Sequence, residues 1–176
     1  MTTTAIARIN ALEQSAFIAL LGGLYEHSPW AAERAFAGAP FADERALSLA
    51  LAATVDTASE NERGALVRAH PELAGEKLRA KALTGSSMSE QASIGLDRLG
   101  PAEIAQWAHL NAAYRERFGF PFVICVRLHT KAEILAALHH RLTRAPREEL
   151  SEAIAQIHDI ARLRLADLLK RMEEGA

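Results

Sequence analysis

Glycine and proline divide this 176-residue sequence into segments that are rich in alanine and leucine and poor in β-branched residues. Alanine and leucine favour helices, whereas proline and glycine mark where helices start and end. We see no internal repeat, low-complexity tract or linker between these segments. We therefore predict an all-α fold, a single-domain helical bundle over residues 1–176 with about seven to eight helices.

Capping residues give the limits of the predicted helices. Three pairs fit the capping-box pattern, namely Ser59 with Glu62, Ser87 with Glu90, and Thr130 with Glu133. They predict a helix ending at His70, one over 89–99, and one reaching about Arg144. Near the N-terminus, we expect Asn10 to cap a helix over 11–21, and Pro29 to lie in the first turn of a short helix that ends at about 37. An apolar repeat at Leu47, Leu51 and Val55 predicts a longer helix. Two more helices are predicted from Pro101 to Arg117, with Gly119 as terminator, and from Pro146 to about Glu173.

One short apolar segment departs from the helical pattern. Residues 120–126 read FPFVICV, which is β-prone and contains Pro121. We predict an extended conformation there, without a partner strand. Its backbone groups must then find partners in helix ends, side chains, water or a ligand.

His70 and Glu90 are candidate functional residues at two predicted helix ends. Pro71 disfavours helical geometry at His70, and the spacing of Leu66, Val67 and His70 turns the imidazole inward. His70 is either a C-capping histidine favoured by the helix dipole or a catalytic group. Glu90 is either the third residue of a capping box or a functional carboxylate.

Arg164 is a basic residue on an apolar helix face. At spacings of three and four, its line contains Ile154, Ile157, Ala161 and Leu168. Arg162 and Arg171 fall off this line. A buried guanidinium is costly unless it is paired or bound to an anion, so Arg164 is either a structural, snorkelling arginine or an anion-binding one.

Several classes of protein and site are excluded by what the sequence lacks. The net charge is −2 and no basic stripe with aromatic residues occurs, so no nucleic-acid partner is expected. A single cysteine, Cys125, permits no internal disulfide and fits a reducing, cytoplasmic location. No apolar run is long enough to span a membrane. Metal-ligand spacings, a phosphate-binding glycine loop and a Gly-x-Ser-x-Gly elbow are also missing, so we expect no metal and no cofactor.

Six short motifs occur in a fixed order: EHSPW at 26–30, AHPEL at 69–73, SEQ at 89–91, LNxxY at 110–114, FGFPF at 118–122 and IAxLRL at 160–165. In these residues the chain resembles the 2-oxo-4-hydroxy-4-carboxy-5-ureidoimidazoline (OHCU) decarboxylases of urate degradation. The resemblance implies an all-helical, cofactor-free enzyme, often a homodimer, whose small-molecule partner is the ureidoimidazoline. It would release CO2 and form (S)-allantoin.

The resemblance also implies roles for particular residues. His70 and Glu90 would be the catalytic pair, and Arg164 would contact the anionic substrate. The implied pocket residues are Pro71, Ser87 (with Ser89 as a substitute) and Gln91, with backbone hydrogen bonds from Phe122, Val123 and Ile124. Two alternatives remain: a non-catalytic helical scaffold whose inward histidine and arginine satisfy one another, and a module that binds ureides without turnover.

Overall fold

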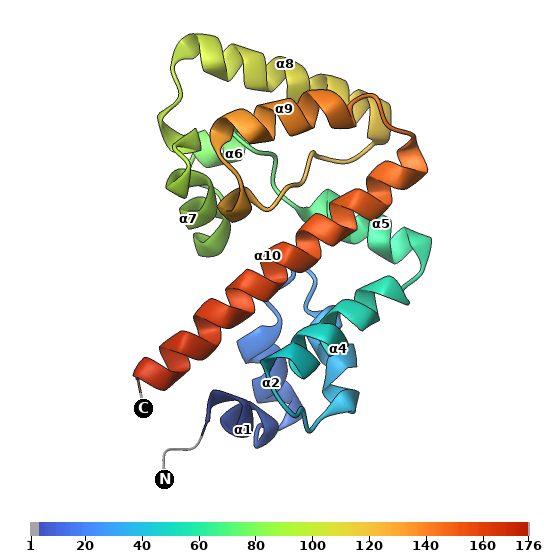
Figure 1. Cartoon of the computed structure of the whole chain (residues 1–176), viewed down its shortest axis with the longest axis vertical. Coiled ribbons are helices and arrows are strands. Elements are labelled where there is room, and N and C mark those ends of the chain that lie inside the picture. Colours follow the sequence, from blue (N-terminus) through green and yellow to red (C-terminus); the bar gives the residue numbers. More distant parts are fainter. Residues whose placement is uncertain (1–3, 176) are drawn as a thin grey trace. The chain divides into compact units, whose positions relative to one another are not determined.

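Figure 1 shows the computed structural model of the chain, which describes residues 4–175. These residues contain no strand, and they form ten α-helices and three short 3-10 helices. The α-helices are α1 Ala5–Asn10, α2 Gln14–Leu21, α3 Trp30–Ala35, α4 Glu44–Asp56, α5 Glu60–Ala69, α6 Glu76–Arg79, α7 Gly85–Ser93, α8 Pro101–Phe118, α9 Lys131–Arg141 and α10 Pro146–Glu174. The all-α prediction is confirmed, and seven of the ten helices have eight residues or more. Over residues 4–175, no helix has the length and apolarity needed to cross a bilayer.

The described residues form two compact units. The first contains residues 4–66 and 158–175, and the second contains Val67–Ile157. Helices α5 and α10 each contribute residues to both units. The prediction of a single domain over residues 1–176 stays a prediction.

Aromatic rings and one helix face form the core of the first unit. Phe17 packs edge-on against Phe36, with ring centroids 5.3 Å apart. The predicted apolar repeat of α4 is confirmed, because Leu47, Leu51 and Val55 are all buried. Each such side chain stabilises the fold by about 1.5–3 kcal/mol when it leaves water.

Asn10 ends a helix instead of starting one. Helix α1 finishes at Asn10, and α2 starts at Gln14 with Glu13 as its N-cap, so the predicted helix over 11–21 began too early. The Asn10 carboxamide donates to the Phe41 C=O and accepts from the Phe41 N–H, both at 2.8 Å. The capping prediction is wrong because this side chain pairs with backbone 31 residues away.

Tyr114 lies at the centre of the aromatic core of the second unit. Its ring centroid is 4.6 Å from that of Phe118, 6.1 Å from Phe120 and 5.3 Å from Phe122. Two of these partners come from the segment after α8, which is therefore tied to the core by its aromatic side chains.

The segment after α8 is non-helical, as predicted. Gly119 ends α8 with a φ of 75°, a left-handed conformation that glycine adopts without strain. Residues 121–125 then have no regular secondary structure, and a 3-10 helix over Val126–Leu128 follows. The predicted segment is thus shorter by Val126.

Two of the three predicted capping boxes are confirmed. Glu62 Oε2 accepts the Ser59 N–H at 3.0 Å, and Ser59 Oγ accepts the Glu62 N–H at 3.3 Å. Thr130 and Glu133 make the same reciprocal pair at the start of α9. Hydrogen bonds from Arg34 and Ser59 lower the pKa of the exposed Glu62 carboxyl to about 2.

The third capping box, Ser87 with Glu90, is wrong. Helix α7 begins at Gly85, and its N-cap is Thr84, whose Oγ1 accepts the Ser87 N–H at 3.3 Å. Thr84 offers the same hydroxyl three residues before Ser87, so the helix starts earlier. Ser87 and Glu90 therefore both lie within α7, and Ser87, not Glu90, is the third residue of that helix.

Candidate active site

His70 lies one residue beyond the end of α5, where Pro71 prevents the helix from continuing. The His70 N–H still donates to the C=O of Val67 at 3.2 Å, which closes the last turn. The residue is only 7% exposed. The prediction of an inward imidazole at a helix end is confirmed.

A cavity of about 390 Å³ lies beside His70 in the second unit. Its volume falls within the range of about 300–1,000 Å³ that is typical of small-molecule sites. Its charged lining residues are three basic ones (Arg68, Lys77, Arg115) and two acidic ones (Glu72, Glu76). The other lining residues are His70, Pro71, Gly75 and Pro121. Arg115 is paired with Glu72 at this wall. The other charged lining residues are two basic (Arg68, Lys77) and one acidic (Glu76), and this positive excess makes the cavity suitable for a small anionic ligand.

The loop after His70 and Pro71 is held by two buried amide side chains. Gln91 Oε1 accepts the Ala74 N–H at 2.9 Å, and its Nε2 donates to the Glu72 C=O at 3.4 Å. Asn111 Nδ2 donates to the Leu73 C=O at 2.8 Å. Ala74 has a φ of 52°, a left-handed conformation that is costly for a residue with a Cβ and persists only where its surroundings fix it. Gln91 therefore has a structural role here, and its predicted contact with substrate stays a prediction.

Helix α7 presents three of the predicted site residues. Ser87 is 4% exposed and Gln91 is 2% exposed, and a spacing of four places them on one buried helix face. Glu90 is half-buried, whereas Ser89 is exposed. The structure thus favours Ser87 over Ser89 as a residue that can line an interior site.

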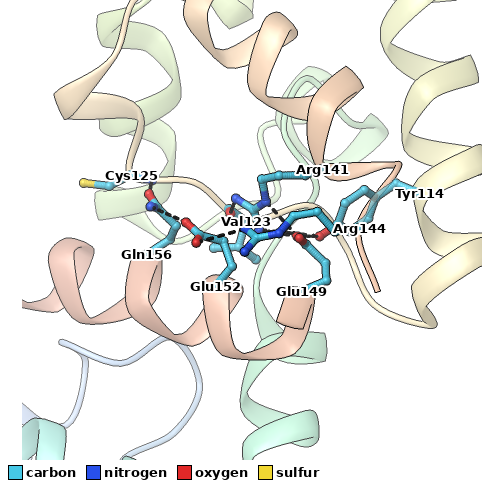
Figure 2. A network of polar contacts seen from close by, with 8 residues as sticks. All are labelled: Tyr114, Val123, Cys125, Arg141, Arg144, Glu149, Glu152 and Gln156. Carbon is cyan, nitrogen blue, oxygen red and sulfur yellow. Dashed lines mark hydrogen bonds and ion pairs between the residues drawn. The ribbon is translucent and has the colours of Figure 1, made fainter. Parts of the chain in front are cut away.

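The extended segment obtains backbone partners from side chains, as its isolation predicted. Arg141 Nη1 donates to the Val123 C=O at 2.8 Å, and Gln156 Oε1 accepts the Cys125 N–H at 2.9 Å (Figure 2). Phe122, Val123 and Ile124 are all buried. Their predicted hydrogen bonds to substrate stay a prediction.

Sequence reasoning missed a buried charged cluster beside this segment. Arg141 is 4% exposed and Glu149 is 0% exposed, and Arg141 Nε donates to Glu149 Oε1 at 2.7 Å. The Tyr114 hydroxyl donates to the same carboxylate oxygen. Burial, followed by this hydrogen bond, raises the pKa of Tyr114 well above its ordinary value.

Arg164 lies in the first unit and is buried, as its place on the apolar line predicted. Its residue is 7% exposed, while Arg162 and Arg171 are exposed. Arg164 Nη1 lies 2.8 Å from Glu26 Oε2, and the Glu26 side chain is 2% exposed. The buried cation therefore has a protein carboxylate as a partner, one that the sequence did not identify.

Eight of the nine predicted site residues belong to the second unit and Arg164 to the first, and of the eight His70 and Pro71 line the cavity. Among residues 4–175, no group of three or more histidine, cysteine, aspartate or glutamate side chains is arranged to hold a metal ion. The roles of the single site residues stay predictions.

A family model described as OHCU decarboxylase matches residues 10–166 of the chain. The chain belongs to the OHCU decarboxylase family. The matched range includes residues of both units and every predicted site residue. The resemblance inferred from the six motifs is confirmed.

Individual relatives agree with this assignment to the OHCU decarboxylase family. The chain is 40% identical over 162 residues to the 2-oxo-4-hydroxy-4-carboxy-5-ureidoimidazoline decarboxylase of Haloferax volcanii, covering 92% of this chain and 94% of the relative. It is 38% identical over 163 residues to the protein of the same name from Amia calva, covering 93% of each. A solved structure described as (S)-allantoin synthase is similar with a TM-score of 0.74 and 30% identity. That similarity covers 94% of this chain and 54% of the other, so the chain spans about half the length of that protein.

Proposed function

We propose that this OHCU decarboxylase family member converts 2-oxo-4-hydroxy-4-carboxy-5-ureidoimidazoline to (S)-allantoin and CO2 in urate degradation. The names of its relatives support this reaction. The structural observation that carries the proposal is the buried His70 beside a cavity whose charged lining is three basic and two acidic side chains. A proton-transfer group beside a cavity suited to an anion is what the reaction needs.

The substrate can lose CO2 by its own chemistry. Its carboxylate is attached to the carbon next to a ring C=N bond. When the bond to the carboxylate breaks, its electron pair forms a C=C bond to the imine carbon, and the imine nitrogen takes up a proton. The resulting enol then loses its hydroxyl proton while the former imine carbon gains a proton on one face, which gives the ring carbonyl and the stereocentre of (S)-allantoin. Because the imine accepts the electrons, we propose that the enzyme uses no cofactor.

His70 and Glu90 are the proposed catalytic pair. An imidazole gives and takes protons near neutral pH, and a positioned acid or base of this kind contributes about 10²–10⁴ in rate. Glu90 is half-buried within α7, and the N-cap of that helix is Thr84, so the Glu90 carboxylate is proposed to orient the imidazole instead of capping the helix. Arg164 is proposed to contact the substrate anion, because a planar guanidinium suits a carboxylate and ring carbonyls.

The test is to generate the substrate enzymatically from urate and to follow optical activity with and without the purified protein. We expect faster formation of (S)-allantoin, unchanged after exhaustive chelation. Activity that is lost on chelation and restored by a metal ion would contradict the cofactor-free mechanism. If the protein does not accelerate the reaction but allantoin raises its melting temperature, it is a ureide-binding module. If it does not accelerate the reaction and allantoin leaves its melting temperature unchanged, it is a scaffold.

We also propose a homodimer located in the cytoplasm. Light scattering coupled to size-exclusion chromatography should give twice the mass of the chain, and the mass of one chain would contradict the dimer. Fractionation of the native cells should recover the protein with cytoplasmic markers.

A further inference from the structure

The extended segment is held along one of its edges. Its two side-chain partners bind Val123 and Cys125, which are two residues apart. In an extended chain, successive residues direct their backbone groups to opposite edges, so residues two apart share an edge. Cys125 has β-region backbone angles, with φ −73° and ψ 90°. The edge that carries Val123 and Cys125 is therefore occupied by protein partners.

The opposite edge carries the backbone groups of Phe122 and Ile124. Among residues 4–175, neither Arg141 nor Gln156 bonds to the N–H or C=O of these two residues. The Arg141 guanidinium lies over the Phe122 ring instead, with Cζ 4.6 Å from the ring centroid. The segment is thus fixed by one edge and one ring, and its second edge is left to other partners.

The two side chains that hold the segment are themselves held by buried or half-buried charges. Glu149 fixes Arg141, as described above, and Glu152 Oε1 accepts from Gln156 Nε2 at 3.0 Å. Glu149, Glu152 and Gln156 follow one another on one face of α10 at spacings of three and four (Figure 2).

Glu152 also binds Arg144 Nη1 at 3.1 Å. Burial would raise the pKa of Glu152, but the hydrogen bonds from Gln156 and Arg144 outweigh it, and the pKa is lowered. Glu152 therefore remains a charged acceptor for Gln156 at neutral pH. The amide of Gln156 is oriented by this contact, with its oxygen toward Cys125.

We propose that Gln156 and Arg141 are positioning residues, which fix the extended segment so that the backbone of Ile124, and not the C=O of Val123, faces the substrate. This inference rests on the proposed function and sharpens it, because the Val123 C=O is already an acceptor for Arg141. In a sheet, a neighbouring strand would bond these backbone groups, and here the side chains of Arg141 and Gln156 bond them instead.

The test uses Gln156, because replacing Arg141 would remove the ion-pair partner of the buried Glu149. Gln156→Met removes the acceptor of the Cys125 N–H while keeping side-chain length. Gln156→Glu combined with Glu152→Gln exchanges the two groups, which keeps an acceptor at position 156 without placing two carboxylates in contact. Gln106→Met is the matched control, since Gln106 is exposed on α8.

We expect Gln156→Met to raise KM for the ureidoimidazoline about 3- to 10-fold, the loss of one neutral hydrogen bond, with a smaller change in kcat and a near-normal melting temperature. The exchanged pair, Glu152→Gln with Gln156→Glu, should restore most of the affinity, and Gln106→Met should behave as the wild type. Hydrogen exchange over residues 120–128 should become faster in Gln156→Met alone.

Each other outcome overturns the positioning role. Wild-type KM and kcat in Gln156→Met, unchanged exchange, no rescue by the exchanged pair, or activity that falls only with the folded fraction would each do so. If the wild type has no decarboxylase activity, the proposed function fails separately. The positioning role is then judged by added (S)-allantoin, which should slow exchange over 120–128 in the wild type but not in Gln156→Met, and equal protection in both would overturn it.

Discussion

Replacing Arg164 with methionine removes its charge while keeping an unbranched apolar stem. The guanidinium lies 2.8 Å from the Glu26 carboxylate, and the two side chains are 7% and 2% exposed. Removing one partner of a buried ion pair costs about 3–5 kcal/mol. In a chain of this size each kcal/mol lowers the melting temperature by about 2–4 °C. We therefore expect Arg164→Met to lower the melting temperature by about 6–20 °C.

A second substitution separates stability from catalysis. Glu26→Gln in the Arg164→Met background also removes the buried negative charge, and a neutral pair of similar volume often costs little stability. The double variant should regain most of the lost melting temperature. If Arg164 contacts the substrate anion, turnover should stay low in both variants, since neutrality does not replace the planar guanidinium.

The assay combines thermal unfolding by circular dichroism with formation of (S)-allantoin from enzymatically generated substrate. Arg162→Met is the matched control on the same helix, because Arg162 is exposed and pairs with the exposed Asp159 at 3.0 Å. Such a surface pair contributes about 0–1 kcal/mol. Turnover that recovers with stability in the double variant would refute substrate contact by Arg164. If Arg164→Met has the same melting temperature as the wild type, the claim that the ion pair of Arg164 and Glu26 stabilises the fold is refuted.

Four further outcomes follow from the site and the caps. His70→Asn should keep its helical circular dichroism and lose about 10²–10⁴ in decarboxylation rate, and a near-normal rate would move proton transfer to another residue. Because Glu90 lies inside α7, Glu90→Gln should melt near the wild type with strongly reduced turnover, and full turnover would remove this carboxylate from the mechanism. Ser87→Ala should raise KM while Ser89→Ala should not, since Ser87 is 4% exposed and Ser89 is exposed; equal KM values would contradict this. The folded-state pKa of Glu62 is about 2 against an ordinary 4.5, so its stabilising contribution is present above the ordinary value and is lost as pH falls toward 2. Glu62→Gln should therefore flatten the melting profile in that window, and an unchanged slope would contradict the assignment.

Local signals were sufficient to predict most helices and the extended segment. Pro101 and Gly119 delimit α8, and Pro146 begins α10, as their backbone preferences require. The segment before Val126 is non-helical because it combines proline with β-prone residues. Each of these limits depends on groups within a few residues, so the sequence contains the information directly.

The error at α7 arose from competition between neighbouring hydroxyl groups. Ser87 and Glu90 fit a capping box, but Thr84 reaches the Ser87 N–H first and starts the helix at Gly85. A pattern match considers one cap at a time, whereas the chain chooses among all of them. The consequence concerns the proposed site, because Ser87, Glu90 and Gln91 come from the body of one helix and not from its end.

For Arg164 and the segment over 120–126, the sequence predicted that partners are required but did not identify them. A cation on an apolar helix face and an extended segment without a neighbouring strand both require hydrogen-bonding or charged partners. Those partners are Glu26, 138 residues before Arg164, and Arg141 and Gln156, 18 and 31 residues from the backbone groups that they bind. Their identity depends on tertiary structure, which local pattern does not specify.

The cluster of Arg141 and Glu149 was missed for a different reason, because nothing in the positions of these two residues in the sequence suggests that they are buried and need a partner. Arg141 is in the last turn of α9 and Glu149 is in the first turn of α10, where a cation and a carboxylate respectively are favoured by the helix dipole even when exposed. An ordinary explanation was therefore available for each, although they are 4% and 0% exposed. Burial changes what the pair does, since Arg141 also binds the Val123 C=O inside the segment proposed to meet the substrate. Arg141 and Glu149, which hold the extended segment, thus look in the sequence like ordinary charged residues at helix ends. Neither residue belongs to one of the six motifs, yet we expect their substitution to change the affinity for substrate.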